Sequence, residues 1–398
     1  MAEAKDYSAL LKDALKNYVG ETDISELDLE GLISTGRDIM SGMSAPTIVS
    51  FGGDLFRRVC EFHLTNDVYK ADNINIMKDS KVWGAYILDT YFELVEPQAN
   101  PSYNLINGQR VEQDTITAPN FIVRVYESKN SFEVPYTISD KMLRSAFINE
   151  GEFRSFVQGI EIAVDNSVEQ YIEDLCMEAK NNYIALKYEV ATDDTLDATE
   201  RGIQVVNLLS DYNTLNNTSL TVDTCRKDAS FLKYCVQQFI DYEKLLRKMT
   251  VLFNIEKYKR FAKVLNFDVL SQFASDIKIN MSSDVYHNEL VALPNYLEVP
   301  FWQGVGTGAD FDTRSTIKVT TSEGNSVTVE GVVGFMYDER AIGITVWDET
   351  TKAHRNDHGE YTNYWDAHTS GLFNNLTRNA LVFVLQDEPL IPPTETQS

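Results

Sequence analysis

A long run of apolar residues at three- and four-residue steps is the clearest pattern in this chain. The run follows Asn149, and Glu152 stands three residues later, which is the spacing of a helix capping box. Side chains at such steps line one face of an α-helix. We predict a single helix that continues to Tyr183, on the order of 45 Å long at about 1.5 Å per residue, as the backbone of a domain. Its apolar stripe comprises Phe153, Phe156, Val157, Ile160, Val164, Val168, Tyr171, Ile172, Leu175 and Ala179.

Alternation of apolar and polar residues predicts strands on either side of this helix. Residues 132–138 alternate as a half-buried strand does. Before them, Asn107-Gly108 tolerates the positive φ of a tight turn and predicts a long β-hairpin with 121–126 in its second half. An isolated two-stranded hairpin is marginal in water, so we expect it to lie on a partner surface or on its own domain. Further strands are expected within 82–95, 202–209, 277–279, 290–299, 316–321, 326–330, 331–337, 341–347 and 380–385.

Amphipathic spacing near the N-terminus predicts two short helices, at about residues 10–18 and 24–40. A Gly- and Ser-rich patch at 41–46 separates them from the next unit. We interpret them as an arm that packs on a neighbouring copy, or alternatively on its own domain. Helices are also expected at 51–64 and over roughly 14 residues from Asp228, with turns at 211–213 and 216–217.

Composition limits the partners that this chain can have. The 398 residues are 43% hydrophobic, which is enough to bury a core. The formal net charge is -25, so we do not expect the protein to coat nucleic acid, because phosphate binding needs clustered Lys and Arg. Like charge also opposes self-association unless the charges form complementary patches. The basic stretch 244–263 is interpreted as a solvated helix face or a contact for the acidic surface of another copy. A nucleic-acid patch is the less favoured alternative.

Cysteine usage and the apolar runs indicate where the protein is used. Cys60, Cys176, Cys225 and Cys235 show no CxxC spacing, which favours thiols in a reducing compartment. The first twenty residues lack the features of a signal peptide, and no apolar run approaches the roughly 18 residues of a membrane span. We therefore predict a cytosolic protein without a membrane partner.

Three of the five histidines provide the one metal-like pattern. His354 and His358 have the i, i+4 spacing of a shared helix face, and His368 could add a third ligand. However, residues 355–359 favour a loop, so all three histidines are expected in a polar loop, and no glutamate sits inside the pair as in HExxH. A metal-dependent hydrolase that uses His354, His358 and His368 is therefore the less favoured alternative. We assign no catalytic, cofactor or metal site and predict that the protein is not an enzyme.

The order of these elements resembles that of the major capsid proteins of tailed bacteriophages, which have the Hong Kong 97-like fold. The chain is most similar to those of small short-tailed phages. Two segments carry the likeness: 137–157 (TISDKMLRSAFINEGEFRSFV) and 335–365, above all YDERAIGI at 337–344 and EYTNY at 360–364. The likeness in element order begins at about residue 80, and its motifs are moderately specific. Such proteins often carry Pro-Arg where Asp357-His358 precede Gly359 here, so a basic contact at that place is not carried over.

The resemblance implies an α+β fold and a subunit that assembles as pentamers and hexamers into an icosahedral head shell around the genome. It also implies a scaffolding protein, a portal, and packaged double-stranded DNA contacted weakly and without sequence preference. The subunit would be assembled in the host cytoplasm and end in the virion. An encapsulin-like compartment shell is the alternative. The implied parts are an N-terminal helical arm (1–79), the first part of a peripheral domain (80–91), an extended β-hairpin loop (92–133), the peripheral domain with a spine helix (134–200), an axial domain (201–339) and a C-terminal return to the peripheral domain (340–398).

Overall fold

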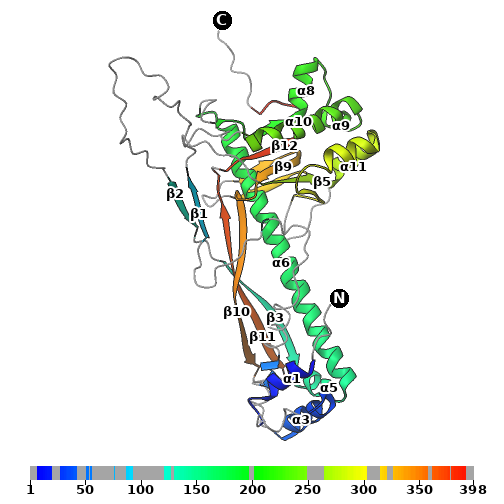
Figure 1. The fold of residues 1–398 in the computed structure, drawn as a ribbon, viewed down its shortest axis with the longest axis vertical. Helices are drawn as coiled ribbons and strands as arrows, with labels where there is room; N and C mark the ends of the chain where they lie inside the picture. The colour runs from blue at the N-terminus through cyan, green and yellow to red at the C-terminus, as the bar shows by residue number, and fades with distance from the viewer. Residues whose placement is uncertain are drawn as a thin grey trace, which may run out of the picture. The chain divides into compact units, whose positions relative to one another are not determined.

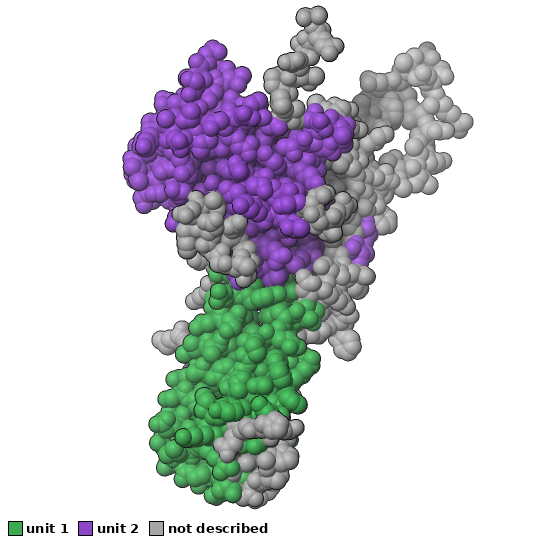
Figure 2. Space-filling view, turned by 180° about the vertical axis from the view of Figure 1, so that it is seen from behind, with its two compact units in different colours: residues 1–71, 129–173, 345–371 green, residues 72–128, 174–344, 372–398 purple. Residues whose placement is uncertain are grey.

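The structure, a computed structural model, mixes helices and strands, as the α+β prediction expects (Figure 1). Two compact units make up the chain, and both are discontinuous in sequence (Figure 2). Unit 1 comprises residues 1–71, 129–173 and 345–371, and unit 2 comprises 72–128, 174–344 and 372–398. The residues that the structure describes are 7–19, 27–42, 51–52, 54–55, 76, 87–92, 121–126, 130–196, 201–248, 264–302, 314–320, 326–356, 361–376 and 378–390.

The helices of the described residues include both predicted N-terminal segments. The first of these begins earlier than predicted and the second ends later, at Gly42. The helices are α1 (Tyr7–Leu15), α3 (Leu29–Gly42), α5 (Asp140–Ala146), α6 (Glu150–Thr192), α8 (Leu208–Asn216), α9 (Val222–Cys225), α10 (Ala229–Lys248), α11 (Ser271–Asn280) and the π-helix η3 (Val285–Leu290).

Helix α6 confirms the strongest sequence prediction. It begins after Asn149, whose side chain accepts a hydrogen bond from the N–H of Glu152 at 2.9 Å, so that one exposed donor of the first turn is satisfied. The helix has 43 residues and continues past Tyr183 to Thr192. Residues 150–173 belong to unit 1 and residues 174–192 to unit 2. Its buried stripe includes Phe153, Val157, Ile160, Val164 and Val168 in unit 1, and Leu175, Cys176, Ala179, Tyr183 and Ile184 in unit 2.

Four sheets account for the strands of the described residues. One sheet has three strands in the order β10-β11-β3, and one has five in the order β4-β12-β9-β5-β6. The other two sheets have two strands each, β1-β2 and β7-β8. The strands are β1 (Ile87–Phe92), β2 (Phe121–Tyr126), β3 (Asn130–Ser139), β4 (Val205–Asn207), β5 (Leu265–Leu270), β6 (Tyr296–Val299), β7 (Ile317–Thr320), β8 (Ser326–Val329), β9 (Val332–Asp338), β10 (Ile342–Arg355), β11 (Tyr361–Asn374) and β12 (Ala380–Val384).

In unit 1, strand β3 is antiparallel to β11 from the pair Ser139–Tyr361 to the pair Asn130–Ser370. The predicted alternation is confirmed, because Phe132, Val134 and Ile138 are buried and Tyr136 is partly buried, while Glu133, Pro135 and Thr137 are exposed. The buried face of β3 contacts α6 through Phe132, whose ring stacks on Tyr171 with centroids 4.2 Å apart. The strand and the helix thus share one core within this unit.

The N-terminal helices pack on unit 1 itself, which is the alternative to packing on a neighbouring copy. The Arg37 side chain donates from Nε to the carbonyl oxygen of Phe147 at 2.9 Å, and a second nitrogen donates to the carbonyl of Ile148. A Cβ at Gly36 would lie 2.4 Å from the Phe147 ring, so this position requires a residue without one. The described part of the arm is therefore built into its own unit.

Unit 2 is organised around the five-stranded sheet, whose central strands β9 and β5 are buried along their whole length. Strand β9 is antiparallel to both β5 and β12, and the outer pairs β4–β12 and β5–β6 are parallel. Phe239 of α10 packs on Phe383 and Phe267, at centroid distances of 4.9 and 5.0 Å. Buried Trp302 donates its indole N–H to the carbonyl of Val332 at 2.9 Å. Aromatic rings from β5, β12 and α10 are therefore part of the core.

Several local predictions are wrong in unit 2. Residues 211–213 lie in α8 and not in a turn, and the strand expected at 202–209 contains only Val205–Asn207. Residues 277–279 belong to helix α11, because Phe273, Ala274 and Ile277 bury one helical face while Ile279 is 76% exposed. The helix expected from Asp228 has 20 residues, and η3 takes the first residue of the 290–299 strand, of which only β6 remains.

Other predictions are confirmed or lie outside the described residues. The hairpin of β7 and β8, the antiparallel pairing of β1 with β2, and strand β12 are as expected. The Asn107-Gly108 turn, most of 51–64, residues 43–46 of the Gly- and Ser-rich patch, and residues 249–263 of the basic stretch lie outside the described residues.

Candidate functional site

The histidines of the metal-site hypothesis occupy different environments. His354 is exposed on β10, His368 is buried on β11, and His358 lies outside the described residues. The polar loop expected for this segment is therefore wrong for His354 and His368, which lie in paired strands. Within the described ranges, no group of three or more His, Cys, Asp or Glu side chains could hold a metal ion.

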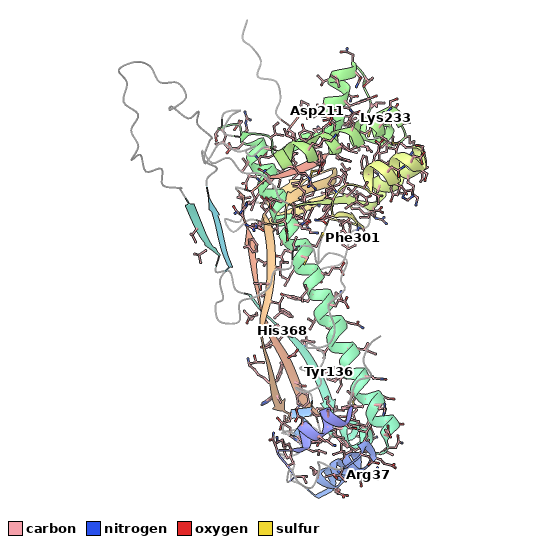
Figure 3. The ribbon with its side chains drawn as sticks, viewed as in Figure 1. Arg37, Tyr136, Asp211, Lys233, Phe301 and His368 are labelled. Atoms are coloured by element: carbon pink, nitrogen blue, oxygen red, sulfur yellow. The ribbon has the colours of Figure 1, made fainter. Side chains whose placement is uncertain are left out.

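His368 belongs to a buried stack of side chains in unit 1. Its Nε2 lies 2.8 Å from Oδ2 of Asp366, and its ring stacks on Phe132 with centroids 5.0 Å apart. Phe132 in turn stacks on Tyr171 of α6. Figure 3 labels His368 along the ribbon of β11. With one nitrogen bonded to a carboxylate and one ring face covered, His368 has a packing role.

The buried face of β11 is unusually polar for a strand. Every second residue is buried, as in an amphipathic strand, but most of these residues are polar. Their polarity led the sequence interpretation to a loop, although strand pairing requires backbone groups and not apolar side chains. The buried residues at alternate positions are Thr362, Tyr364, Asp366, His368 and Ser370.

A buried ion pair joins α6 to the large sheet in unit 2. Nζ of Lys180 lies 2.7 Å from Oδ2 of Asp268 on β5, and both side chains are fully buried. The hydroxyl of Tyr337 on β9 donates to the same carboxylate oxygen at 3.3 Å. Desolvation offsets much of the attraction in such a pair. We infer that its main contribution is to hold this part of α6 in one register against β5 and β9.

Lys187, two helical turns further along, is a second buried cation. Its Nζ donates to Oε1 of Gln204 and to the carbonyl of Leu376, each at 2.9 Å. Tyr183, one turn before it, donates its hydroxyl to the carbonyl of Asn375 at 3.0 Å. Burial lowers the pKa of Lys187 to about 7. The amine therefore serves chiefly as a hydrogen-bond donor between α6 and the segment that links β11 to β12.

This environment predicts a pH-dependent stability. Between pH 7 and the ordinary lysine pKa of 10.5, the unfolded chain binds a proton at Lys187 that the folded chain does not. The free energy of unfolding of the wild type therefore rises with pH in this window by up to about 1.4 kcal/mol per pH unit. Below pH 7 the contribution of Lys187 to this free energy does not change with pH. The Lys187→Met variant lacks this pH-dependent contribution.

Urea denaturation at pH 7.5, 8.5 and 9.5 measures the effect. The difference in unfolding free energy, wild type minus Lys187→Met, is expected to grow with pH. Lys233→Met removes an exposed lysine of α10 and controls for the general loss of a cation. A difference that stays constant across the three pH values would contradict the assigned environment of Lys187.

The thiols of unit 2 are unsuited to nucleophilic catalysis. Cys176, Cys225 and Cys235 are buried and free of disulfides. Burial raises the pKa of Cys225 to about 11 and raises that of Cys235 well above its usual value. Because the thiolate is the reactive form, these cysteines are inert packing residues.

Sequence reasoning missed Lys180, Asp268 and Lys187. The available signal was the position of Lys187 four residues after Tyr183, on the continuation of the apolar stripe, where a charged residue implies a buried partner. The partners Asp268 and Gln204 could not be found in this way, because the pairing depends on which strand packs against α6.

Two exposed features complete the description of the surfaces. Val123 and Val125 on one face of β2 are 46% and 53% exposed, and among the described residues β2 pairs with β1 only. In the basic stretch, Arg247 pairs with Glu243 one turn away on α10. No described helix is both long enough and apolar enough to span a membrane.

A model of the family described as "Phi29-like phage major capsid protein" matches residues 7–384. No curated protein matches the chain.

Solved structures of phage capsids are also similar. "Capsid structure of Staphylococcus phage Andhra" has 10% identity and a TM-score of 0.48, covering 81% of this chain and 86% of that one. A chain of bacteriophage P68, titled "Structure of head fiber and inner core protein gp22 of native bacteriophage P68", has 10% identity and a TM-score of 0.44, covering 80% and 86%. "Asymmetric unit of bacteriophage PhiM1 mature capsid" has 8% identity and a TM-score of 0.42, covering 81% and 89%.

Proposed function

The chain belongs to the Phi29-like phage major capsid protein family, and we propose that its copies form pentamers and hexamers that close into an icosahedral head shell. Family membership makes the protein a structural component of the virion, assembled from many copies of itself, and not an enzyme. The predicted Hong Kong 97-like fold is confirmed by the same assignment. The observation that best supports this proposal is the extent of the family match, which runs from the first residue of α1 to the last residue of β12.

We propose that the chain has the domains that the sequence resemblance implies, each with its own place in the shell. Residues 201–339 form an axial domain at the capsomer centre, and residues 134–200 with α6 form the peripheral domain, joined by 80–91 and 340–398. Small changes in hinge and loop angle let one subunit fit both pentamers and hexamers. The proposed division cuts across units 1 and 2, since α6 contributes to both.

The pairing of β2 with β1 supports a role for residues 92–133, which include β2, as a loop that lies over a neighbouring subunit. Two strands by themselves are marginally stable in water, and within the described residues this sheet has two strands. One face presents Val123 and Val125 to solvent. Burial of that face against a second copy removes apolar surface from water, which favours association.

Charge on α6 supports weak contact with packaged double-stranded DNA. Its exposed ionisable side chains are mainly carboxylates, and Arg154 already pairs with Glu150. Carboxylates repel phosphates, so a shell lining of this kind lets DNA enter and leave without sequence preference. A head structure in which packaged DNA lies mainly against Lys and Arg clusters would overturn this part of the proposal. The exposed carboxylates are Glu152, Glu173, Glu178 and Glu189.

A scaffolding protein and a portal complete the proposed set of partners, and host cytoplasm is the proposed place of assembly. These rest on family membership. The encapsulin-like compartment shell has no observation that favours it over a phage head, and the contents of the shell distinguish the two.

Electron microscopy tests the assembly directly. The chain is expressed alone and with its candidate scaffold, and particles are imaged by negative stain and then by cryo-EM. We expect closed shells with five- and sixfold capsomers, and DNA inside particles from infected cells. Soluble monomers under both conditions, or shells from infected cells that hold protein cargo in place of DNA, would overturn the proposal.

A further inference from the structure

Exposed apolar side chains gather at helix α5 of unit 1. Of the exposed large hydrophobic residues that the structure describes in this unit, all but Ile162 lie on α5 or beside it. Met142 is on the helix and Ile148 follows its last turn, and they are 46% and 59% exposed. Tyr361, 53% exposed, lies opposite Ser139, the residue that caps α5. An exposed apolar cluster rimmed by polar residues is typical of an interaction surface.

Two cations share the exposed face of this helix. Residues three and four apart are neighbours on a helix surface, so Lys141, Arg144 and Ile148 follow one another along α5. Met142, next to Lys141, is exposed as well, and both cations are exposed. The opposite side of the helix is buried. The free face of α5 is therefore both basic and apolar.

Arg37 of helix α3 adds a third cation at the end of α5 (Figure 1, Figure 3). Its guanidinium donates to the carbonyls of Phe147 and Ile148, which fixes the position of its charge. Both acceptors are neutral, so they leave this charge uncompensated. We call this surface the α5 patch, and it comprises Arg37, Lys141, Met142, Arg144, Ile148 and Tyr361.

No carboxylate pairs with the three cations of the α5 patch within the described part of the chain. Of the carboxylates near them in sequence, Asp140 and Glu150 already pair with other arginines. Asp38 and Glu152 are exposed and pair with none of the three. Burial of an unpaired charge is costly, so a cation that enters an interface needs an anion across it. A partner of this surface must therefore bring carboxylates together with apolar groups.

A second copy of this chain has the chemistry that the α5 patch requires. The chain has 60 acidic and 35 basic residues, so its surface is anionic overall and is attracted to unpaired cations. Like charge opposes the association of copies unless basic patches meet acidic ones. DNA phosphates would pair with the cations and leave the apolar side chains in water, whereas Arg, Tyr and Met are enriched in contacts between proteins.

We propose that the α5 patch binds an acidic surface of a second copy within the shell. The cations meet carboxylates across the contact, and the apolar side chains between them leave water, which favours association. Complementary charge also speeds the encounter of the two copies and excludes wrong orientations. The inference rests on shell assembly from many copies and adds a surface through which copies meet.

Charge reversal tests the α5 patch. In Lys141→Glu/Arg144→Glu two carboxylates would face the acidic surface of the next copy, and we expect the fraction of chains in shells to fall about tenfold or more. Sedimentation and negative stain measure the fraction, and circular dichroism confirms that the variant is folded. Neither side chain has an ion-pair partner among the described residues, so the subunit itself is expected to keep its stability.

A matched variant separates the contact from a general effect of charge. Lys233→Glu/Lys318→Glu makes the same change in net charge at exposed positions of α10 and β7 in unit 2. It is expected to assemble as the wild type does. Equal losses in the two double variants, or wild-type assembly by Lys141→Glu/Arg144→Glu, would overturn the inference and leave the shell function intact.

Zero-length cross-linking identifies the occupant of the α5 patch. A carbodiimide joins a lysine to a carboxylate at ion-pair distance, and heads assembled from isotope-labelled and unlabelled chains reveal links between copies by their mixed masses. We expect Lys141 to be linked to an Asp or Glu of a second copy. Lys141→Arg keeps the charge, is expected to assemble normally and cannot form the link.

The other outcomes of the cross-linking experiment count against a contact between copies. Links of Lys141 only within its own chain, links only to a scaffolding protein, or the absence of any link in assembled heads would overturn the inference. Failure of the wild type to form shells would instead count against the proposed function.

Discussion

Replacement of Asp268 with alanine is expected to lower the free energy of unfolding of unit 2 by about 3–5 kcal/mol. The reason is that Lys180 then remains fully buried 2.7 Å from where its counter-ion was. The hydroxyl of Tyr337 also loses this acceptor. Urea denaturation followed by circular dichroism measures the loss.

A double variant separates the loss of the whole ion pair from the loss of one of its two charges. Lys180→Met/Asp268→Leu replaces both charges with apolar groups, and its stability is expected to lie far closer to the wild type than that of Asp268→Ala, because no buried charge is left alone. Asp241→Ala, at an exposed carboxylate of α10, is the matched control and should change stability little. Equal losses for Asp268→Ala and Asp241→Ala would show that the pair is not isolated from solvent.

Gly331→Ala is expected to cost about 2–5 kcal/mol, from left-handed backbone strain and a steric overlap. Gly331 has φ of 71°, and a Cβ there would lie 2.2 Å from the carbonyl oxygen of Leu385. The same two residues are joined by a hydrogen bond from the N–H of Leu385 to the carbonyl of Gly331, at 2.8 Å. The backbone at the start of β9 would have to separate from the end of β12.

Gly159 of α6 provides the control for this substitution. A Cβ at that position meets no atom within 4 Å, and alanine is favoured over glycine within a helix by up to about 1 kcal/mol. Gly159→Ala is therefore expected to keep or raise stability while Gly331→Ala lowers it, both followed by thermal and urea denaturation. A Gly331→Ala protein as stable as the wild type would contradict the close approach of the two backbones.

The elements that the sequence predicted well are those with strong local signals. Helix α6 combines an apolar stripe with a cap at Asn149, and β3 alternates cleanly, so both were found. Strand β11 was missed because its buried positions are polar, and α11 was mistaken for a strand because Ile277 and Ile279 are β-branched. Local propensity gives way to tertiary packing at such places.

Features that depend on long-range pairing could not be predicted from local pattern. The placement of β5 between β9 and β6 joins segments far apart in the chain, and the Lys180–Asp268 pair follows from it. The metal-site hypothesis, in contrast, relied on a local pattern alone. The spacing of His354 and His358 suggested a shared helix face, while the structure places His354 on a strand. The family resemblance is confirmed, and its second segment, 335–365, contains β10 with parts of β9 and β11.

The pairing of β3 with β11 sets an order of events during synthesis. Their partners, such as Ser139 and Tyr361, are more than 200 residues apart. At a ribosomal rate of about 5–20 residues per second, β3 therefore waits for tens of seconds without its partner strand. A chain that ends before residue 361 therefore lacks the pairing of β3 with β11 in unit 1.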